Sequence, residues 1–421
     1  MNHLRRELVS LLSVSGALSV FPVTTFAQSN ATGVRPPRAD QVMWGGMGYS
    51  VPNADVSRYF PMVSAALAGV GGQGKLAMAF AEKLSKSYPG GVTENPSKLL
   101  DANSDPALLF SVSLDFEQMI LVPNDGGSSD FQLSFVYALA QVLYLDLPRS
   151  GGSDGDLRVL YSFPFRVQSG ETPRIGSDQD RVTNFKKLLF DLDNSLLNVF
   201  DRKVATKKFR EARLPKRMKV MSVTLTPEAE SSIKELGLSN ALGAQFFGQA
   251  MTASLAEKGD LSVLPYAQND VLNGALAARF NQFPNIGKIF NRLNDPLENN
   301  FSIDITVHRV LRKSNGSNIS NILYARGISI FVKLKDVHKE KVVFDKKILL
   351  IENNELPKAM FDRLKDYDLR YLVQISIKLF DFFTDAVLSE NAEKLKAVGL
   401  EPSKDMPEVK ALKEVLLSCR Y

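Results

Sequence analysis

The chain of 421 residues contains a single cysteine, Cys419, and three histidines. One cysteine cannot form an intramolecular disulfide, so the apolar core has to hold the fold together. Beyond the first residues, no segment approaches the ~18 uninterrupted apolar residues that a membrane-spanning helix needs. No cysteine–histidine cluster of zinc-site spacing and no EF-hand loop is present. We therefore expect no transmembrane segment in the mature chain, no metal site and no cofactor.

The first residues have the pattern of a cleavable secretory signal. Two early arginines precede a mostly apolar stretch, Leu8 to Val23, and Thr25-Phe26-Ala27 then supplies a small-x-small cleavage site. We expect residues 1–27 to be removed after Ala27 and residues 28–40 to form a loose lead-in. Because Gln28 follows the predicted cut, a lipid anchor on an amino-terminal cysteine is excluded. The pattern predicts a soluble periplasmic protein, with secretion as the alternative.

Composition agrees with a globular exported protein. A hydrophobic content of 44% is enough for two sizeable cores. The formal net charge is only +5, which argues against a nucleic-acid partner for an exported chain. The absence of disulfides fits a bacterial periplasm better than an animal extracellular space. We expect Cys419 to be a free thiol on a loose carboxyl terminus.

The chain carries nearly the same pattern twice. Residues 110–117 (FSVSLDFE) and 301–308 (FSIDITVH) both alternate apolar and polar side chains, which predicts two half-buried strands. A Leu-Phe-Asp motif in an amphipathic segment follows each strand, at 189–191 and 379–381. The separations, 301 − 110 = 191 and 379 − 189 = 190 residues, are nearly equal. We infer two tandem α+β domains that arose by duplication.

The periodicities divide the chain into two domains and a tail. Residues 41–203 are expected to form domain 1 and residues 219–390 domain 2, each a small, mainly antiparallel sheet packed against helices. Residues 204–218 are a basic linker, and residues 391–421 a carboxyl-terminal helical tail. The expected strands are 42–49, 109–122, 131–147, 157–168, 219–225, 261–265, 301–311, 323–335 and 342–351. The expected helices are 76–88, 181–203, 241–258, 369–388 and 407–417, and residues 272–299 are expected to be an insertion.

The opening of domain 2 resembles a bacterial envelope fold. Residues 220–223, 246–258 and 261–265 resemble the strand–helix–strand opening of the TolB amino-terminal domain, the curli secretion channel, penicillin-binding-protein activators and periplasmic flagellar-ring proteins. The resemblance spans roughly 130 residues and rests on hydrophobic pattern. It implies a scaffold or assembly factor without catalytic residues. The chain departs from the family in the segment Glu228–Asn240 before the helix, and it lacks the lipid-anchor cysteine of several members.

Two glycine-rich motifs match the sequence patterns of a phosphate-binding loop and of a nucleophile-bearing turn. Residues Gly69–Lys75 fit the phosphate-loop pattern G-x-x-x-x-G-K, but Leu76 stands where Ser or Thr would hold Mg²⁺. We expect a flexible turn before a helix, and leave open whether the loop binds an anion. Residues Gly151–Gly155 fit G-x-S-x-G, but a strand rather than a helix follows, so we expect a hairpin loop. His308 and His338 are expected to be solvated.

The region between the two domains is strongly basic. Between Arg202 and Lys219 there are nine bases and one acid, Glu211. This run is a candidate docking surface for lipid headgroups, lipopolysaccharide or an acidic partner. The alternative is a solvated helix end and linker whose bases complement the helix carboxyl terminus. The candidate residues are Arg202, Lys203, Lys207, Lys208, Arg210, Arg213, Lys216 and Arg217.

These features favour a non-enzymatic periplasmic scaffold or assembly factor that binds an envelope protein or an anionic envelope surface. Tandem domains also suit homo-oligomerisation, because each offers a sheet edge for pairing. An alternative is a periplasmic carrier that binds a small ligand between the domains. A third hypothesis is a hydrolase whose residues converge only in three dimensions, since Asp115, Glu117, Asp304 and His308 lie on polar strand faces.

Overall fold

The computed structural model describes most of the chain beyond residue 41. The described residues are 42–49, 54, 56–88, 90–93, 107–122, 131–146, 156–169, 172–173, 177–205, 216–264, 266, 300–358 and 364–420. The predicted signal peptide, the lead-in, the Gly151–Gly155 loop, the 272–299 insertion and residues 206–215 of the linker lie outside them. Within the described part, no helix has both the length and the apolar character needed to cross a bilayer.

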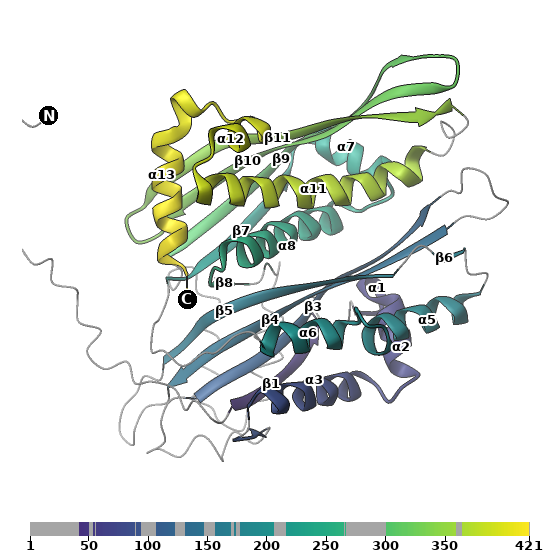
Figure 1. The fold of residues 1–421 in the computed structure, drawn as a ribbon, viewed down its shortest axis with the longest axis vertical. Helices are drawn as coiled ribbons and strands as arrows, with labels where there is room; N and C mark the ends of the chain where they lie inside the picture. Colours follow the sequence, from purple (N-terminus) through teal and green to yellow (C-terminus); the bar gives the residue numbers. More distant parts are fainter. Residues whose placement is uncertain are drawn as a thin grey trace, which may run out of the picture. The chain divides into compact units, whose positions relative to one another are not determined.

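The chain is an α+β protein with two mixed sheets, which confirms the predicted fold class (Figure 1). Sheet A, in the first half, has the order β2-β1-β3-β4-β5, with β6 paired to β4. Its strands are β1 (Val42–Tyr49), β2 (Val92–Thr93), β3 (Ala107–Val122), β4 (Phe131–Asp146), β5 (Asp156–Gln168) and β6 (Thr172–Pro173). Strand β1 runs parallel to β2 and β3, whereas β3, β4 and β5 form the predicted antiparallel meander. The prediction missed the parallel pairs, which arise because helices carry the chain back before β2.

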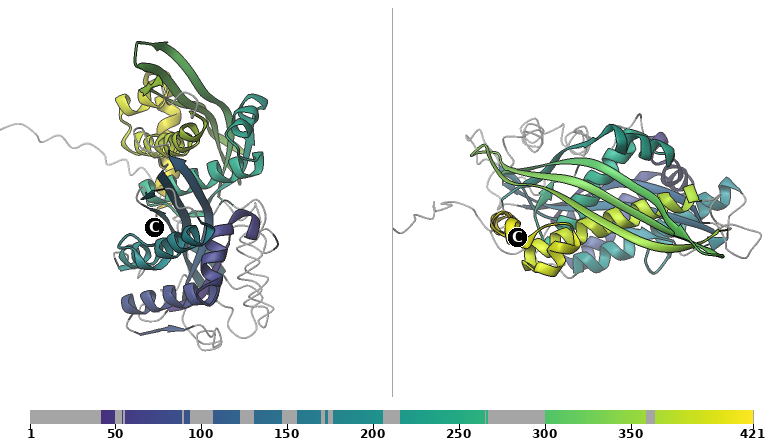
Figure 2. Two further views of the ribbon diagram at one scale, coloured as in Figure 1. Left: turned by 90° about the vertical axis from the view of Figure 1, so that its right-hand side faces the viewer. Right: turned by 90° about the horizontal axis from the view of Figure 1, so that it is seen from above.

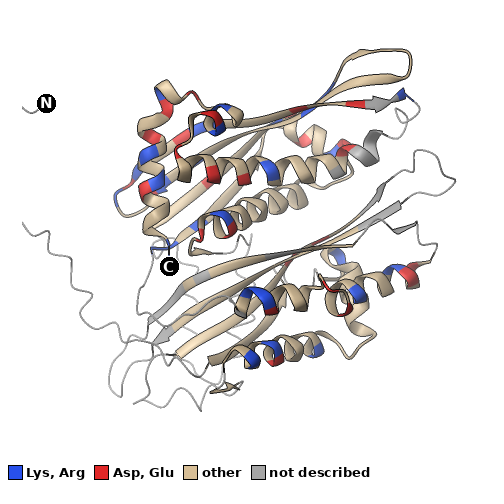
Figure 3. Cartoon of the chain, in the orientation of Figure 1, with Lys and Arg blue, Asp and Glu red and all other residues tan. Residues whose placement is uncertain are grey.

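Sheet B, in the second half, has the same topology. Its order is β11-β10-β9-β7-β8, with β7 parallel to β8 and β9 and the remaining pairs antiparallel. Its strands are β7 (Met218–Leu225), β8 (Val263–Leu264), β9 (Phe301–Ser317), β10 (Asn321–Asp336) and β11 (Lys341–Pro357). The hairpin of β9 and β10 runs on past helix α11 (Figure 2). Its tip, residues 314–325, carries no charged side chain (Figure 3).

The two sheets are also irregular at matching positions. Leu108 of β3 and Phe301 of β9 lie opposite the first residue of the parallel partner strand. One residue of β3, Asp115, has no partner in the pairing with β4, and one residue of β9, His308, has none in the pairing with β10. Equivalent positions of β3 and β9 are thus separated by 193 residues in both cases (301 − 108 and 308 − 115). The β1/β3 and β7/β9 ladders shift after their third pair in both halves, and the β4/β5 and β10/β11 ladders also shift at matching places. Duplication stays a proposal, and these matched bulges favour it.

Helices cover one face of sheet A (Figure 1). They are α1 (Val56–Tyr59), α2 (Pro61–Ala68), α3 (Gln73–Ser87), α5 (Asp178–Lys186), the π-helical turn η2 (Lys187–Asp191) and α6 (Leu196–Ala205). Phe80 of α3 lies between Trp44 of β1 and Phe200 of α6, at ring-centroid distances of 6.2 and 4.9 Å. The expectation of one helix over 181–203 is wrong. The backbone is extended at Leu192, and the Ser195 hydroxyl accepts the N–H of Asn198 (3.4 Å), so a new helix starts there.

The helices of the second half are α7 (Pro227–Glu235), α8 (Asn240–Gly259), α11 (Leu364–Ser389), α12 (Ala392–Ala397) and α13 (Pro402–Ser418). The expected loose carboxyl terminus is wrong, because Leu412, Leu416 and Cys419 are buried in the same core as sheet B. Cys419 is 0% exposed, and its carbonyl oxygen accepts the N–H of Ser262 (2.8 Å). Burial raises the pKa of its thiol to about 12.

Nearly all residues of helix α8 from Gly243 to Ala256 are buried, because the helix also contacts sheet A. Phe246 of α8 lies 5.7 Å from Phe116 of β3, measured between ring centroids. The side-chain amide of Gln245 donates to the Asp115 carbonyl oxygen (3.1 Å). Phe116 therefore belongs to the core of the second half.

Candidate functional site

The glycine-rich run at 69–75 is a turn between two helices. The N–H groups of Gly69 and Gly72 donate to carbonyl oxygens of α2, those of Ala65 (3.3 Å) and Leu67 (2.8 Å). Gly71 and Gly72 have φ of 102° and 82°, which L side chains rarely adopt. A phosphate loop instead follows a strand and turns its N–H groups toward the phosphate. The predicted turn before a helix is confirmed.

Two carboxylates on β3 are buried, contrary to the expectation of a half-buried strand. The carboxylate of Glu117 accepts the N–H groups of Met62 (2.8 Å) and Val63 (2.7 Å) at the start of α2. Burial raises the pKa of Glu117 to about 7, and these two hydrogen bonds oppose the rise. Asp115, at the bulge, accepts the hydroxyl of Ser113, and burial raises the pKa of Asp115 to about 7. Both carboxylates therefore have structural partners.

The four residues of the hydrolase hypothesis are divided between the two sheets. Asp304 and His308 belong to β9 of sheet B, whereas Asp115 and Glu117 belong to β3 of sheet A. The Asp304 carboxylate accepts the hydroxyl of Ser222 (2.7 Å) and pairs with Lys335 (3.1 Å). The partners described for Glu117 and Asp304 include none of the other three residues. Whether the protein is an enzyme is not decided by this, and the non-enzymatic interpretation stays a prediction.

The basic run is described only at its two ends. Arg202 donates to the Asp193 carbonyl oxygen (2.9 Å), and Lys203 pairs with Glu257 (3.6 Å). Lys216 lies over the ring of Phe301, 5.5 Å from its centroid, and Arg217 is buried. The other four candidate residues lie outside the described part, so docking by this run stays a prediction. They are Lys207, Lys208, Arg210 and Arg213.

A buried charged cluster near the start of α11 was not predicted. The Arg326 guanidinium lies between the rings of Tyr324 and Tyr371, 4.8 Å from each centroid. Its Nε donates to Asp368 (2.7 Å), which also pairs with Arg312 (3.5 Å). Burial is the first cause that raises the pKa of Tyr371 to about 12. The adjoining cavity is only about 10 Å³, room for about one water, so the cluster attaches α11 to β10 and does not form a ligand site.

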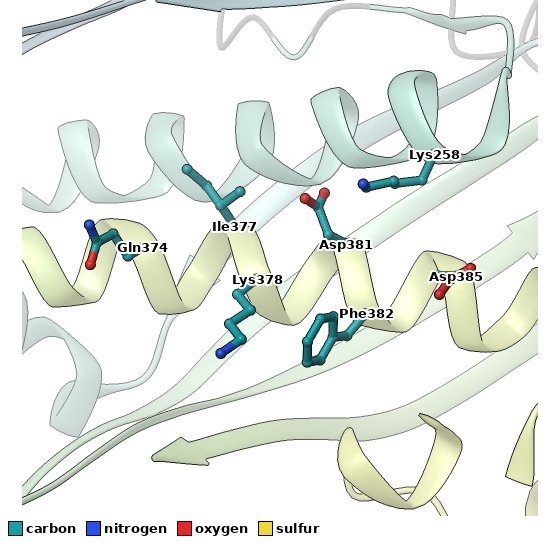
Figure 4. A pocket seen from close by; sticks show the side chains of 7 residues that line it. All are labelled: Lys258, Gln374, Ile377, Lys378, Asp381, Phe382 and Asp385. Atoms are coloured by element: carbon teal, nitrogen blue, oxygen red, sulfur yellow. The ribbon is translucent and has the colours of Figure 1, made fainter. Parts of the chain in front are cut away.

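Two shallow hollows lie on the second half. One, of about 470 Å³, follows α8 and α11 (Figure 4). In it Lys258 points toward Asp381, and the half-exposed ring of Phe382 faces the Lys378 ammonium at 5.5 Å. The other, of about 510 Å³, lies between the start of β11 and α13. Neither is lined by residues of the first half, whereas the carrier hypothesis expected a site between the two domains.

Exposed apolar side chains gather on the second half. Eight large apolar residues in the described part are exposed, and five of them lie on β10, β11 or the β9–β10 turn. Leu323 (39%), Phe331 (39%) and Ile351 (50%) lie on the sheet face away from the core, and Ile319 (94%) lies in the turn. Ile351 lies across Gly327, where a Cβ would come within 2.8 Å of its Cγ1, so only glycine fits beneath it. Hereafter, the open face of sheet B means Thr306, Leu311, Lys313, Leu323, Phe331, Lys347 and Ile351.

Cations border this surface. Lys347 lies 6.0 Å from the Phe331 ring centroid, and His308 contacts the same ring at 5.4 Å. Lys313 and Lys347 are both exposed, and neither has an acidic partner among the described residues. Other bases of this face are paired, including Lys333 with Asp345 at 3.6 Å. The surface thus combines an apolar stripe with two cations that are free to pair.

No protein-family model matches the chain, and no curated protein sequence matches it. Solved structures with weak likeness include lipoprotein GNA1162 of Neisseria meningitidis (15% identity, TM-score 0.21), which covers 38% of this chain and 99% of its own. The hypothetical protein CT253 of Chlamydia trachomatis has 13% identity and a TM-score of 0.20, over 38% and 98% of the two chains. A neuraminyllactose-binding hemagglutinin homolog of Helicobacter pylori has 10% identity and a TM-score of 0.21, over 40% and 94%. TM-scores at this level carry no argument, and the TolB-type resemblance stays a prediction.

Proposed function

We propose that the protein is an exported, non-enzymatic periplasmic scaffold or assembly factor that binds another component of the cell envelope. The observation that carries this proposal is the open face of sheet B, where three large apolar side chains are 39–50% exposed. Large apolar side chains exposed on one face of a sheet favour a binding partner over solvent. The signal-peptide pattern at residues 1–27 supports export.

In-cell crosslinking of the tagged mature protein tests this proposal. After low- and high-salt washes, the bound proteins are identified by mass spectrometry, and the same experiment is done with Phe331→Asp and with Met78→Asp. Met78 is 63% exposed on α3, far from the open face in sequence, so it is the matched control. We expect recurrent envelope proteins that Phe331→Asp loses and Met78→Asp retains. An eluate that holds only the bait would contradict the proposal.

A small-ligand carrier is the second candidate. The hollow of about 470 Å³ along α8 and α11 favours the carrier hypothesis, because Phe382 is 40% exposed there beside both basic and acidic side chains. Thermal unfolding against a panel of metabolites tests the carrier hypothesis. One metabolite should raise the melting temperature, and Phe382→Ala should abolish that rise. No response to the whole panel would remove this candidate.

A further inference from the structure

The matching faces of sheets A and B differ in whether another element covers them. In sheet A, Ser111, Gln141 and Ser162 lie opposite one another across β3, β4 and β5. All three are at most 3% exposed, and the Ser162 hydroxyl donates to the Val263 carbonyl oxygen (2.5 Å). This face of sheet A is therefore covered by the second half, which also contributes helix α8 through the ring pair of Phe246 and Phe116.

The equivalent row of sheet B lies on its open face. Asp304, Lys333 and Asp345 lie opposite one another across β9, β10 and β11, at the places of Ser111, Gln141 and Ser162. The side chains of Lys333 and Asp345 are 38% and 49% exposed. The equivalent face is therefore covered by a helix in sheet A, whereas in sheet B it is partly exposed.

We propose that the open face of sheet B docks an amphipathic helix with an acidic polar side, supplied by another protein. This deepens the proposed scaffold function and rests on it. A helix fits because α8 already covers the matching face of sheet A. Leu323 and Phe331, on one strand, are eight residues apart, which is ~26 Å of strand. That length matches about 17 residues of helix.

The charges select an acidic helix. Lys313 and Lys347 flank the apolar stripe and lack acidic partners among the described residues. Glu355, the nearby acid on β11, accepts the side-chain amide of Asn321 (3.3 Å). Acidic side chains on either side of a docked apolar stripe would pair with the two lysines, whereas basic ones would be repelled.

Helix α3 of a second copy does not have this character. The counterpart of α8 in the first half is α3, whose exposed side carries Lys75, Glu82 and Lys86, and Met78 as its large apolar residue. Its exposed charges are thus mainly basic, like those of the open face. Helix α3 of a second copy therefore does not fit, and self-association through another element is an outcome of the test below.

Two designed peptides test the inference on the purified mature protein. Both are 18-residue helices with leucine at i, i+3, i+4 and i+7, and they differ only in carrying glutamate or lysine on the polar side. Fluorescence anisotropy should show saturable, salt-sensitive binding of the glutamate peptide alone. Phe331→Asp and the double variant Lys313→Glu/Lys347→Glu should each weaken it at least about tenfold. The control Met78→Asp should bind as the wild type does, and melting curves check that every variant folds.

Equal binding of the two peptides, or binding that these variants do not change, would overturn the inference. So would self-association of the wild type that Phe331→Asp abolishes, because the occupant would then be a second copy. Binding to anionic lipid vesicles in place of the peptide would also overturn it. The two proposals fail separately. Envelope proteins crosslinked without peptide binding would leave the scaffold function standing, and peptide binding without crosslinked proteins would leave only the docking surface.

Discussion

Sheets A and B share one topology and one set of bulges, yet the rows Ser111–Gln141–Ser162 and Asp304–Lys333–Asp345 differ in every residue. The first row is uncharged and buried beneath the second half, and the second is charged and partly exposed. The identity of these residues therefore follows from what covers the sheet and not from the strand pattern. A polar residue of an alternating strand faces water only if no other element covers that side.

The helices α3 and α8 should give the largest contrast. Phe246→Asp places a charge in α8 between the two sheets and should lower the free energy of unfolding by about 4 kcal/mol or more. Met78→Asp, on the exposed side of α3, should change it by less than about 0.5 kcal/mol. Urea denaturation followed by circular dichroism measures both. Similar losses in the two variants would mean that α8 is not covered by sheet A.

The pH dependence of stability should come from β3. Burial raises the pKa of Asp115 from 3.8 to about 7, so the folded protein keeps this proton where the unfolded chain has lost it. The free energy of unfolding should therefore fall as the pH rises from about 4 to about 7. Asp115→Asn should remove part of this fall and stabilise the protein at pH 8 by about 2 to 4 kcal/mol.

Ser113→Ala is the companion variant for this prediction. The Ser113 hydroxyl lowers the pKa of Asp115, so its removal should extend the fall in stability to higher pH. Urea midpoints from pH 4 to pH 9 measure the profile of each variant. A profile that Asp115→Asn leaves unchanged would show that the carboxyl is not buried in the folded protein.

Glu117 should have a smaller effect, because it binds the amino terminus of one short helix. Glu117→Gln keeps the size of the side chain but leaves one acceptor for the N–H groups of Met62 and Val63. Because burial raises the pKa of Glu117 from 4.5 to about 7, ionisation of this carboxyl destabilises the folded protein at pH 8, and the amide avoids that cost. We therefore expect a loss of about 1 kcal/mol at pH 5, measured by thermal unfolding, that shrinks or changes sign at pH 8. The equivalent position in sheet B is Val310, an apolar core residue (310 − 117 = 193). Val310 has no carboxylate, so it cannot accept N–H groups from helix α7 as Glu117 does from α2. An unchanged melting temperature at pH 5 would contradict the assignment.

The covered and open rows should respond in opposite directions to the same substitution. Gln141 is 3% exposed, and its Nε2 has no hydrogen-bond partner in the described part of the chain. Gln141→Met should therefore raise the free energy of unfolding by about 1 kcal/mol. Lys333→Met, at the matching place, removes an exposed ion pair and should lower it by at most about 0.5 kcal/mol. Urea midpoints give both values, and destabilisation by Gln141→Met would count against a dry, covered row.

The strands were predictable because each one carries its own alternation of apolar and polar side chains. The bounds of β1 agree with the expected 42–49, and those of β5 and β7 agree to within one residue. The short helix α7 was missed although Thr226-Pro227 is a cap signal, and the Thr226 hydroxyl does accept the N–H of Ala229 (3.3 Å).

What the sequence could not predict depends on residues far apart in the chain. Arg326 and Asp368 are 42 positions apart, and no local pattern brings them together. The burial of Asp115 and Cys419 likewise depends on packing between distant elements. The alternation of β3 predicted an exposed Asp115, and the position of Cys419 near the end of the chain predicted a loose terminus, because neither pattern contains the element that covers the residue.

Thiol labelling at two matched positions tests the difference between the two sheets most directly. Ser111→Cys and Asp304→Cys occupy the same place in β3 and β9 (304 − 111 = 193). The native Cys419 is 0% exposed and supplies the unreactive background. We expect a maleimide to label the cysteine at 304 rapidly in the folded protein and the one at 111 only after unfolding in urea. Equal labelling rates at the two positions in the folded protein would contradict the account.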